Sequence, residues 1–363
     1  MRFARIPIVP HPRLNEASYL DLIRGATRGA GASAARALLG LASLPYRAAM
    51  TARNLGYDRR SGWSSRAGVP VVSIGNLTLG GTGKTPMVEW VARRFRAGGI
   101  RVAILSRGYG GSTGLNDEGR VLEENLPDVP HLQGADRVAL ARVAVEELHA
   151  QALVLDDGFQ HRRLYRDLDI VLLDALSPFG LGWLTPRGLL REPVGSLRRA
   201  GVVVLSRADL VEPSDRAAIR VEAERRGGPL RWAEARHAPV ALAGEGLPPM
   251  PVAELRGARV AAFCGIGNPE GFRRTIEPLC GSLAAFRAFP DHHRYAAADI
   301  DDLSRWARDA GADLALTTQK DSVKLRVATL GPTPLRSLRI GLDVIAGVEH
   351  LDEALGRLDL PTP

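Results

Sequence analysis

A glycine-rich loop between an apolar run and a helical pattern most constrains what this chain can fold into. Residues 69–74 are rich in Val and Ile, and Gly-Asn-Leu-Thr-Leu-Gly-Gly-Thr-Gly-Lys-Thr-Pro follows at 75–86. A helical pattern then runs over 87–97, and Pro86 suits a first helical turn because it has no N–H to leave unused. A strand, a glycine-rich turn and a helix in this order predict a phosphate-binding loop.

In such a loop, main-chain N–H groups converge on phosphate oxygens and the helix N-terminus adds a favourable dipole. Lys84 would reach the outer phosphates, and the hydroxyl of Thr85 would hold Mg²⁺. Thr78 stands where the first Gly of the usual pattern belongs, and the alternative is a β–α turn without a ligand. The residues predicted to bind the nucleotide are Gly80, Gly81, Thr82, Gly83, Lys84 and Thr85.

The lysines of this chain are unusually few. Lys and Arg together number 48, yet only Lys84, Lys320 and Lys324 are lysines. Where nearly every cation is Arg, a lone Lys suggests that a compact ammonium is required, because the two side chains differ in shape and in how they bind anions.

Helix and strand patterns alternate after the loop, which predicts a parallel sheet covered by helices. A linker is expected at 244–251, which is rich in Gly and Pro, and a second β/α series follows it. We therefore predict a P-loop NTPase-like α/β domain at 67–243, a smaller α/β domain at 244–363 and an N-terminal basic amphipathic segment at 1–66.

Composition limits the classes of partner that the chain is expected to bind and the compartment where it is expected to work. The net charge of +8 favours an anionic partner, which includes nucleic acid, a phospholipid surface and a phosphorylated substrate. No recognition helix, RNA-binding signature or aromatic platform supports nucleic acid, and no obligate protein partner is inferred. Two cysteines without paired spacing fit a reducing compartment, and residues 1–13 do not have the pattern of a secretory signal, so a cytoplasmic location is expected.

The N-terminal segment has apolar residues at helical spacing and an excess of Arg. Leu38, Leu41 and Ala42 recur along one face, and Arg24 and Arg28 are among seven arginines that outnumber the acids. A segment of this kind can lie among lipid headgroups. A helix packed on the domain core is the alternative, and the residues do not decide between the two.

Carboxylates follow two further strands. The apolar run 152–155 ends in Asp156 and Asp157, where a carboxylate can reach the Mg²⁺ that bridges nucleotide phosphates. Asp117 follows the strand at 101–105, and ligands of open α/β sheets bind beyond such strand ends. In the second series, Asp291, His292 and His293 follow the strand at 284–288, and a His that faces an Asp across a cleft can remove a proton from an alcohol. Surface residues or weak metal ligands are the alternative for the two histidines.

As an ordered set, these motifs resemble the tetraacyldisaccharide 4'-kinases, also called lipid A 4'-kinases. The resemblance runs from about 69 to 324 and covers most of the chain. Its elements are the loop at 75–86, Ser-Arg-Gly-Tyr at 106–109, Asp-Glu at 117–118, Asp-Asp-Gly-Phe-Gln-His at 156–161, Pro-Arg-Gly-Leu-Leu-Arg-Glu at 186–192, Gly-Ile-Gly-Asn-Pro at 265–269, Asp-His at 291–292 and Thr-Thr-Gln-Lys-Asp at 317–321.

The resemblance implies an enzyme that moves the γ-phosphoryl of ATP to the 4'-hydroxyl of an acylated disaccharide 1-phosphate, giving lipid IVA. It implies Mg²⁺ as a cofactor and work at the cytoplasmic face of the bacterial inner membrane as a peripheral or monotopic protein, which favours the membrane interpretation of the N-terminal segment. A P-loop NTPase that couples hydrolysis to movement or assembly is the alternative.

Carried over by motif, Lys84 cradles phosphates, Thr85 and Asp157 serve the metal, Asp156 acts beside them in catalysis, and Asp117 with His292 forms the base. This chain has Asn116 where the family usually has Gly, and Gln319 where Glu is commoner. The positions assigned to substrate or phosphate contacts are Asn76, Arg107, Gln160, His161 and Arg191.

Overall fold

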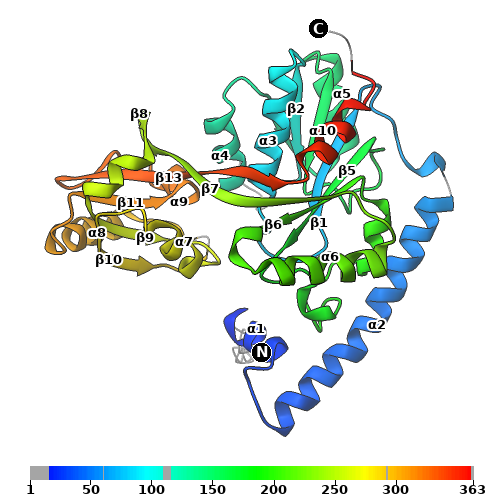
Figure 1. Ribbon diagram of the computed structural model, residues 1–363, viewed down its shortest axis with the longest axis horizontal. Helices are drawn as coiled ribbons and strands as arrows, with labels where there is room; N and C mark the ends of the chain where they lie inside the picture. The colour runs from blue at the N-terminus through cyan, green and yellow to red at the C-terminus, as the bar shows by residue number, and fades with distance from the viewer. Residues whose placement is uncertain (1–15, 60, 109–115, 292, 361–363) are drawn as a thin grey trace, which may run out of the picture.

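The computed structural model describes residues 16–59, 61–108, 116–291 and 293–360 of the chain. Two lobes lie side by side, and two long strands, β7 and β13, run from one into the other (Figure 1). We call the part built on β1–β6 the P-loop lobe and the part built on β9–β12 the second lobe.

The P-loop lobe alternates strands and helices as the sequence predicts. Its elements are β1 (Val71–Asn76), α3 (Lys84–Ala97), β2 (Val102–Ser106), α4 (Asp117–Asn125), β3 (His131–Gln133), α5 (Arg137–Glu146), β4 (Ala152–Asp156), β5 (Leu168–Asp174), β6 (Val202–Ser206) and α6 (Pro213–Gly227). Two helices precede them, α1 (Glu16–Arg24) and α2 (Ala30–Arg59).

The second half of the chain begins with β7 (Trp232–Gly244) and β8 (Leu247–Met250). It continues with β9 (Arg259–Cys264), α7 (Pro269–Ile276), β10 (Ser282–Ala288), α8 (Ala297–Asp309), β11 (Leu314–Thr318), α9 (Gln319–Leu325), β12 (Thr329–Leu330), β13 (Thr333–Ala346) and α10 (Val348–Gly356). Short 3₁₀ turns are η1 (Ser61–Trp63), η2 (Gly180–Gly182), η3 (Val194–Arg199), η4 (Ala208–Leu210) and η5 (Val252–Gly257).

One sheet passes through both lobes in the order β10-β9-β11-β13-β7-β6-β5-β1-β4-β2-β3, with β8 and β12 paired at its side. Neighbours along this order are parallel except β7 and β13, which pair antiparallel. The carboxyl ends of β1, β2 and β4 therefore lie together at one edge of the sheet, where the sequence predicts the phosphate loop and the carboxylates.

The central strands of the P-loop lobe are buried along nearly their whole length, and their side chains alternate between the two faces, so the sheet has a core on each face. On one face, Val72, Ile74 and Val154 pack against α3, α4 and α10. On the other face, α5 covers the β2–β4 side and α6 covers the β5–β6 side, where Tyr46 of α2 also packs. The second lobe has its own two cores, under α7 and under α8.

The expected linker at 244–251 is wrong, because β7 ends at Gly244 and β8 pairs back on it as an antiparallel hairpin. Gly246 lies in the tight turn, and Pro248 and Pro249 lie in strand β8, so this stretch is not a flexible connection. The domain boundaries at 66 and 243 stay predictions. The chain also returns after the second lobe, since Leu351 and Leu355 of α10 pack in the core beside α3.

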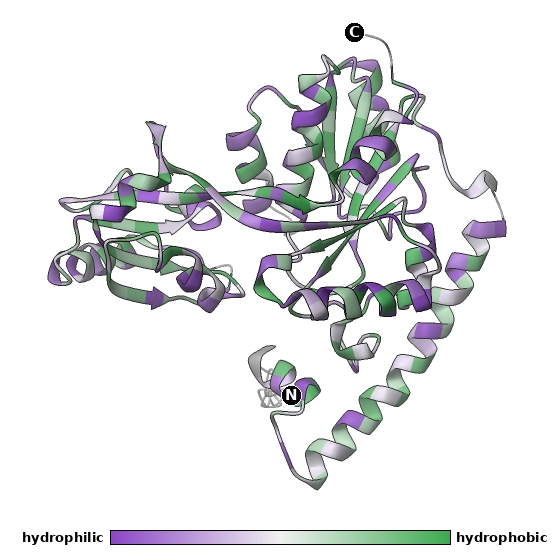
Figure 2. Ribbon diagram, viewed as in Figure 1, coloured by the Kyte–Doolittle hydropathy of each residue, from purple (hydrophilic) through white to green (hydrophobic). Residues whose placement is uncertain are grey.

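The N-terminal helices project from the P-loop lobe (Figure 1). Hydrophobic and hydrophilic bands alternate along α2 (Figure 2), and Leu38, Leu41 and Leu44 are 67%, 63% and 56% exposed. Ser43, which lies between two of these leucines, and Asn54 are the buried residues of α2, and the Ser43 hydroxyl donates to the carbonyl of Leu184 at 3.0 Å. Within the ranges that the structure describes, we find no helix with the length and apolar character needed to cross a bilayer.

Candidate active site

The phosphate loop leaves β1 at Asn76 and enters α3 at Lys84. Gly83 precedes the helix in the left-handed region, at φ 85°, which favours glycine. A Cβ at this position would come 2.3 Å from Nε2 of His237, which β7 brings against the loop. Only glycine fits here, and its conformation sets Lys84 and Thr85 in the first turn of α3.

Side chains behind the loop fix its path. Asn76 donates from Nδ2 to the hydroxyl of Thr82 at 2.9 Å, and Ser206 at the end of β6 donates to the carbonyl of Thr82 at 2.8 Å. Gln160 donates from Nε2 to the carbonyl of Asn76 at 3.0 Å, and Arg207 donates to the carbonyl of Gly81 at 2.9 Å. Asn76 and Gln160, expected at the substrate, therefore brace the loop.

Asp156 is the last residue of β4, beside the phosphate loop, and Asp157 follows it. Asp156 is 7% exposed, and its Oδ1 has no hydrogen-bond partner. Burial raises the pKa of this carboxyl to about 7, and the nearby charge of Glu118 adds to the rise. Asp157 is the first residue after β4 and takes a left-handed conformation, with φ 53°.

Asp157 lies between two cations. Lys84 Nζ is 3.5 Å from its Oδ1, and one terminal nitrogen of Arg191 donates to both carboxylate oxygens at 2.9 and 2.8 Å. Burial alone would raise the pKa of Asp157, but Lys84 and Arg191 outweigh it and the pKa is lowered. Two cations thus meet at the mouth of the loop, which suits an anionic ligand.

Asp117 and Glu118 open α4, with the Asn116 side chain capping the helix through a 2.9 Å bond from the N–H of Gly119. The second lobe supplies a cation to each. Lys320 Nζ lies 2.7 Å from Glu118 Oε1, and Lys324 Nζ lies 3.7 Å from Asp117 Oδ2.

Burial would raise the pKa of Glu118, but Lys320 and then Lys84 lower it overall. Glu118, Lys320 and Lys324 are site residues that the motif assignments missed. The rarity of lysine in this chain is the sequence signal that points to both lysines.

The other predicted residues lie around this edge at different depths. Arg107 follows β2 and is exposed. His161 contacts Arg137 of α5 at 3.3 Å; burial and then Arg137 lower its pKa to about 4. His292 lies outside the described residues. Asp291 lies beside Gly267, where a Cβ would come 3.1 Å from the Asp291 carboxylate.

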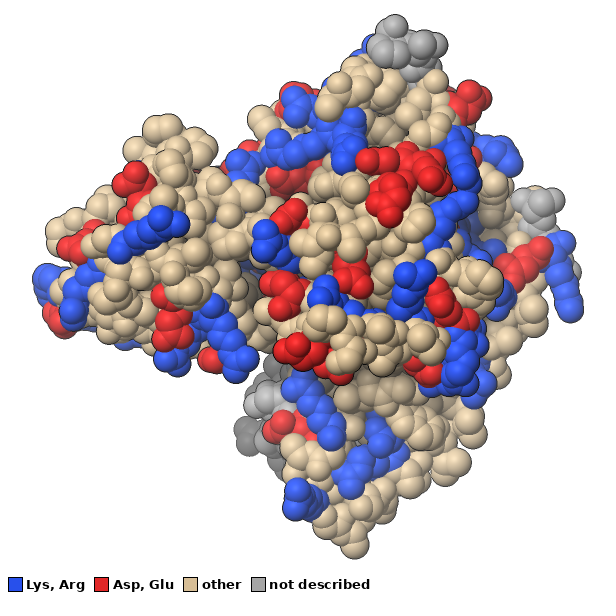
Figure 3. All heavy atoms as spheres, in the orientation of Figure 1, with Lys and Arg blue, Asp and Glu red and all other residues tan. Residues whose placement is uncertain are grey.

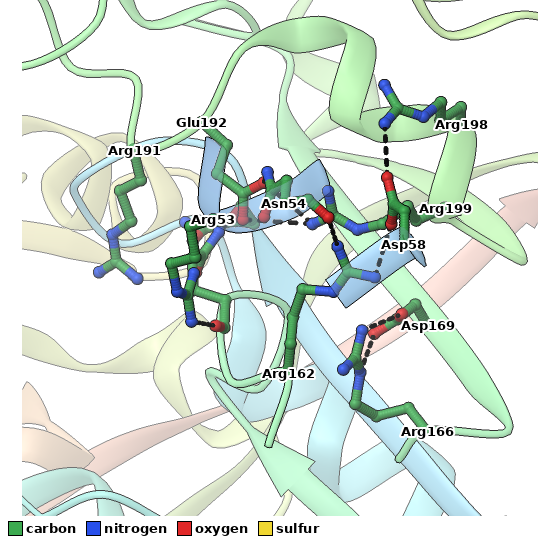
Figure 4. Close-up of polar contacts among 12 residues, drawn as sticks. Arg53, Asn54, Asp58, Arg162, Arg166, Asp169, Arg191, Glu192, Arg198 and Arg199 are labelled. Atoms are coloured by element: carbon green, nitrogen blue, oxygen red, sulfur yellow. Dashed lines mark hydrogen bonds and ion pairs between the residues drawn. The ribbon is translucent and has the colours of Figure 1, made fainter. Parts of the chain in front are cut away.

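Helix α2 is tied to the segment that carries Arg191 (Figure 4). Glu192 is fully buried and accepts hydrogen bonds from Asn54 of α2 at 2.7 Å and from Arg199 at 3.0 Å. The hydroxyl of Tyr46 donates to the carbonyl of Arg191 at 2.9 Å. The part of α2 from Tyr46 to Asn54 therefore holds the segment that carries Arg191, and the exposed Leu38, Leu41 and Leu44 lie toward the N-terminal end of the helix.

This arrangement has the parts that phosphoryl transfer needs. A glycine loop at a helix N-terminus, a lysine, a buried strand-end carboxylate and an arginine surround one position. Fold and site together define a nucleotide-dependent phosphotransferase of the P-loop class.

Comparison with known proteins gives the particular kind. Residues 35–357 match the model of the family described as tetraacyldisaccharide-1-P 4'-kinase. A curated tetraacyldisaccharide 4'-kinase from Anaeromyxobacter dehalogenans (strain 2CP-C) is 47% identical over 345 residues, which cover 90% of this chain and 91% of the relative. Another from Syntrophus aciditrophicus (strain SB) is 43% identical and covers 79% and 84%.

A solved structure of LpxK from Aquifex aeolicus in complex with ATP is also similar, with a TM-score of 0.68 and 28% identity. The match covers 89% of this chain and 98% of that one. The chain belongs to the tetraacyldisaccharide-1-P 4'-kinase family. It is an ATP-dependent kinase that phosphorylates the 4'-position of a tetraacyldisaccharide 1-phosphate.

Proposed function

We propose that the edge where β1, β2 and β4 end performs this transfer, with Lys84 and Arg191 as the phosphate-binding cations. The observation that carries the proposal is their meeting at Asp157, which lies 3.5 Å from Lys84 and is hydrogen-bonded to Arg191. Asp157 pairs with both cations, and the phosphates of bound ATP would share them. Arg107, exposed beyond β2, is proposed as a further phosphate or substrate contact.

The acceptor hydroxyl needs a base, and we assign that role to Asp117 together with His292. As the 4'-oxygen forms its bond to the γ-phosphorus and the bond to the β–γ bridging oxygen breaks, the hydroxyl proton passes to the base. The two electrons of the broken bond stay on ADP, whose growing negative charge Lys84 and Arg191 stabilise. The base itself adds about two to four powers of ten in rate.

The residues present fit Mg²⁺ as well. Asp156 is a buried carboxylate whose Oδ1 has no hydrogen-bond partner and whose pKa is raised by burial, as expected of a group that lacks its cation. We therefore assign Asp156, with the hydroxyl of Thr85, to the metal in place of Asp157, which the motifs indicated, because Asp157 pairs with Lys84 and Arg191. Bound Mg²⁺ would neutralise phosphate charge and orient the γ-phosphoryl.

No group of three or more His, Cys, Asp or Glu side chains gathers around a point anywhere in the described ranges. Phosphate oxygens and water would complete the shell, as is usual for Mg²⁺ in kinases.

The acceptor carries acyl chains, and we propose that α1 and α2 hold the enzyme on the cytoplasmic face of the inner membrane. Three leucines of α2 are more than half exposed, and Arg24, Arg28 and Arg47 of the same N-terminal segment are exposed as well. Figure 3 shows blue Lys and Arg side chains beside tan surface without charged residues on the projection that these helices form. Helices that lie in the membrane interface combine apolar side chains, which insert among the lipids, with cations that attract anionic headgroups.

Transfer is tested with γ-labelled ATP and a tetraacyldisaccharide 1-phosphate acceptor, separated by thin-layer chromatography. We expect label in the glycolipid with the wild type, and none with Lys84→Ala. Arg220→Ala, which removes an exposed pair with Glu224 on α6, is the matched control and should keep full activity. Label found only in free phosphate would contradict kinase activity at this edge.

Membrane contact is tested by sedimentation with vesicles that contain anionic phospholipid. We expect Leu38→Ser, Leu41→Ser and Leu44→Ser in combination to weaken binding at least about tenfold. The control replaces Leu210, Val221 and Val240 by Ser, because these residues are also more than half exposed but lie outside α1 and α2. Equal loss in both variants, or no loss in the first, would refute α2 as the lipid-facing helix.

A further inference from the structure

Helix α9 of the second lobe brings two of the chain's three lysines to the active-site edge. Lys84, Lys320 and Lys324 pair with Asp157, Glu118 and Asp117 in turn. Every lysine in a chain that otherwise uses Arg thus contacts a carboxylate of this edge. The use of a compact ammonium there calls for a geometric reason.

Lys324 is the more enclosed of the two lysines from α9. Its side chain is 10% exposed, and its Nζ lies 3.7 Å from Asp117 Oδ2 and 3.2 Å from Asp321 Oδ1. One ammonium, with three donors, bridges two carboxylates from different lobes. The planar guanidinium of the longer Arg side chain would not occupy the same position.

Asp321 is a rigid base for this bridge. It is fully buried, and its Oδ2 accepts hydrogen bonds from the N–H of Gly265 at 2.9 Å and from the hydroxyl of Thr318 at 2.7 Å. With its second carboxylate oxygen held in this way, Asp321 fixes the position of Lys324. The ammonium then restricts where the Asp117 carboxylate can lie.

The register of α9 on α4 is set by a second contact. Gln319 and Asn125 exchange two amide hydrogen bonds, at 3.0 and 3.3 Å, and both side chains are buried. Asn125 also donates to Glu89 of α3 at 2.8 Å. The exchanged bonds therefore connect α9 through α4 to the helix that begins with Lys84.

We propose that Lys324 is a positioning residue for the reaction: held by Asp321, it orients the carboxylate of Asp117 toward the acceptor hydroxyl, with Gln319 and Asn125 fixing α9 in register. This inference rests on the base role proposed for Asp117. Through Lys324 the second lobe contributes to proton removal.

A double-mutant cycle tests whether Lys324 acts through Asp117. Purified Asp117→Asn, Lys324→Met and the double variant are compared with the wild type for kcat and for KM of both substrates. We expect Lys324→Met to lower kcat about 10- to 100-fold with each KM changed less than about twofold. In the Asp117→Asn background, we expect the same change to lower kcat by less than about twofold.

Lys324→Arg keeps the positive charge, so it is a second variant that tests the proposal if Lys324→Met folds poorly. We expect it to recover part of the lost kcat where Asp117 is intact and to change nothing in the Asp117→Asn background. Thermal unfolding of each variant identifies losses that come from unfolding alone.

The outcomes separate the two proposals. A full-rate Asp117→Asn enzyme would remove the base role and this inference with it. An impaired Asp117→Asn enzyme beside a full-rate Lys324→Met enzyme would overturn the inference alone. So would equal losses from Lys324→Met in both backgrounds, because Lys324 would then act independently of Asp117.

Discussion

Asp156→Asn is expected to make the nucleotide-free, metal-free protein more stable while it abolishes phosphoryl transfer. Burial raises the pKa of Asp156 from 3.8 to about 7, so the folded chain ionises this carboxyl less readily than the unfolded chain does. Stability is therefore lost as pH rises from 3.8 towards 7, and the loss is complete above that range.

The size of the effect follows from the shift. With the pKa at 3.8 when unfolded and about 7 when folded, ionisation costs about 4 kcal/mol at pH 8 and under about 2 kcal/mol at pH 5. An amide at this position avoids the charge but leaves a polar group poorly paired, at a cost of about 1 kcal/mol. We expect a net gain of about 2–3 kcal/mol at pH 8 and nearly none at pH 5.

Urea unfolding of both proteins at the two pH values, with EDTA present, measures this difference. Asp157→Asn is the matched control with the opposite sign. The pKa of Asp157 is lowered by Lys84 and Arg191, so its charge stabilises the fold at pH 8 and this contribution is lost only in acid. No stabilisation by Asp156→Asn at pH 8, or a gain of equal size at pH 5, would refute the reasoning.

Three further changes test other contacts. Gly83→Ala forces a Cβ to within 2.3 Å of His237 Nε2 at φ 85°, so ATP binding by calorimetry should be lost, while Gly257→Ala, with open space around it, should bind normally. Asn54→Leu leaves the buried Glu192 with one hydrogen-bond partner fewer and should lower the free energy of unfolding in urea by about 1–3 kcal/mol. An unchanged unfolding midpoint would show that the bond between Asn54 and Glu192 does not stabilise the packing of α2. Gln319→Glu places a carboxylate beside Glu124 and should lower the melting temperature at pH 8 more than at pH 5, since protonation relieves the repulsion; equal melting at both pH values would contradict this.

Much of the P-loop lobe was predictable because its signals are local. The loop, the helix of Lys84 and the acids after β4 each follow an apolar strand of the expected length, and parallel pairing brings them to one edge. The hairpin at 244–251 was not predictable, because a hairpin rich in Gly and Pro has the same composition as a linker.

The ion pairs between the two lobes could not be predicted from the sequence either. Lys324 lies more than two hundred residues from Asp117, and no local pattern records that α9 packs on α4. The scarcity of lysine marks these residues as unusual but does not say which carboxylates they meet. Likewise, the amphipathic pattern of α2 fits both of its environments, because Leu38 is exposed while Asn54 is buried.

The return of α10 to the P-loop lobe has a practical consequence for anyone who wishes to study half of this enzyme. A fragment that stops at residue 243 would lack Leu351 and Leu355, which close the core beside α3, and would leave β7 without its antiparallel neighbour. Exposed apolar surface and an unpaired strand both invite aggregation. Truncation between the lobes should therefore give insoluble material, whereas an inserted domain that keeps the chain continuous is better placed in the turn between β7 and β8.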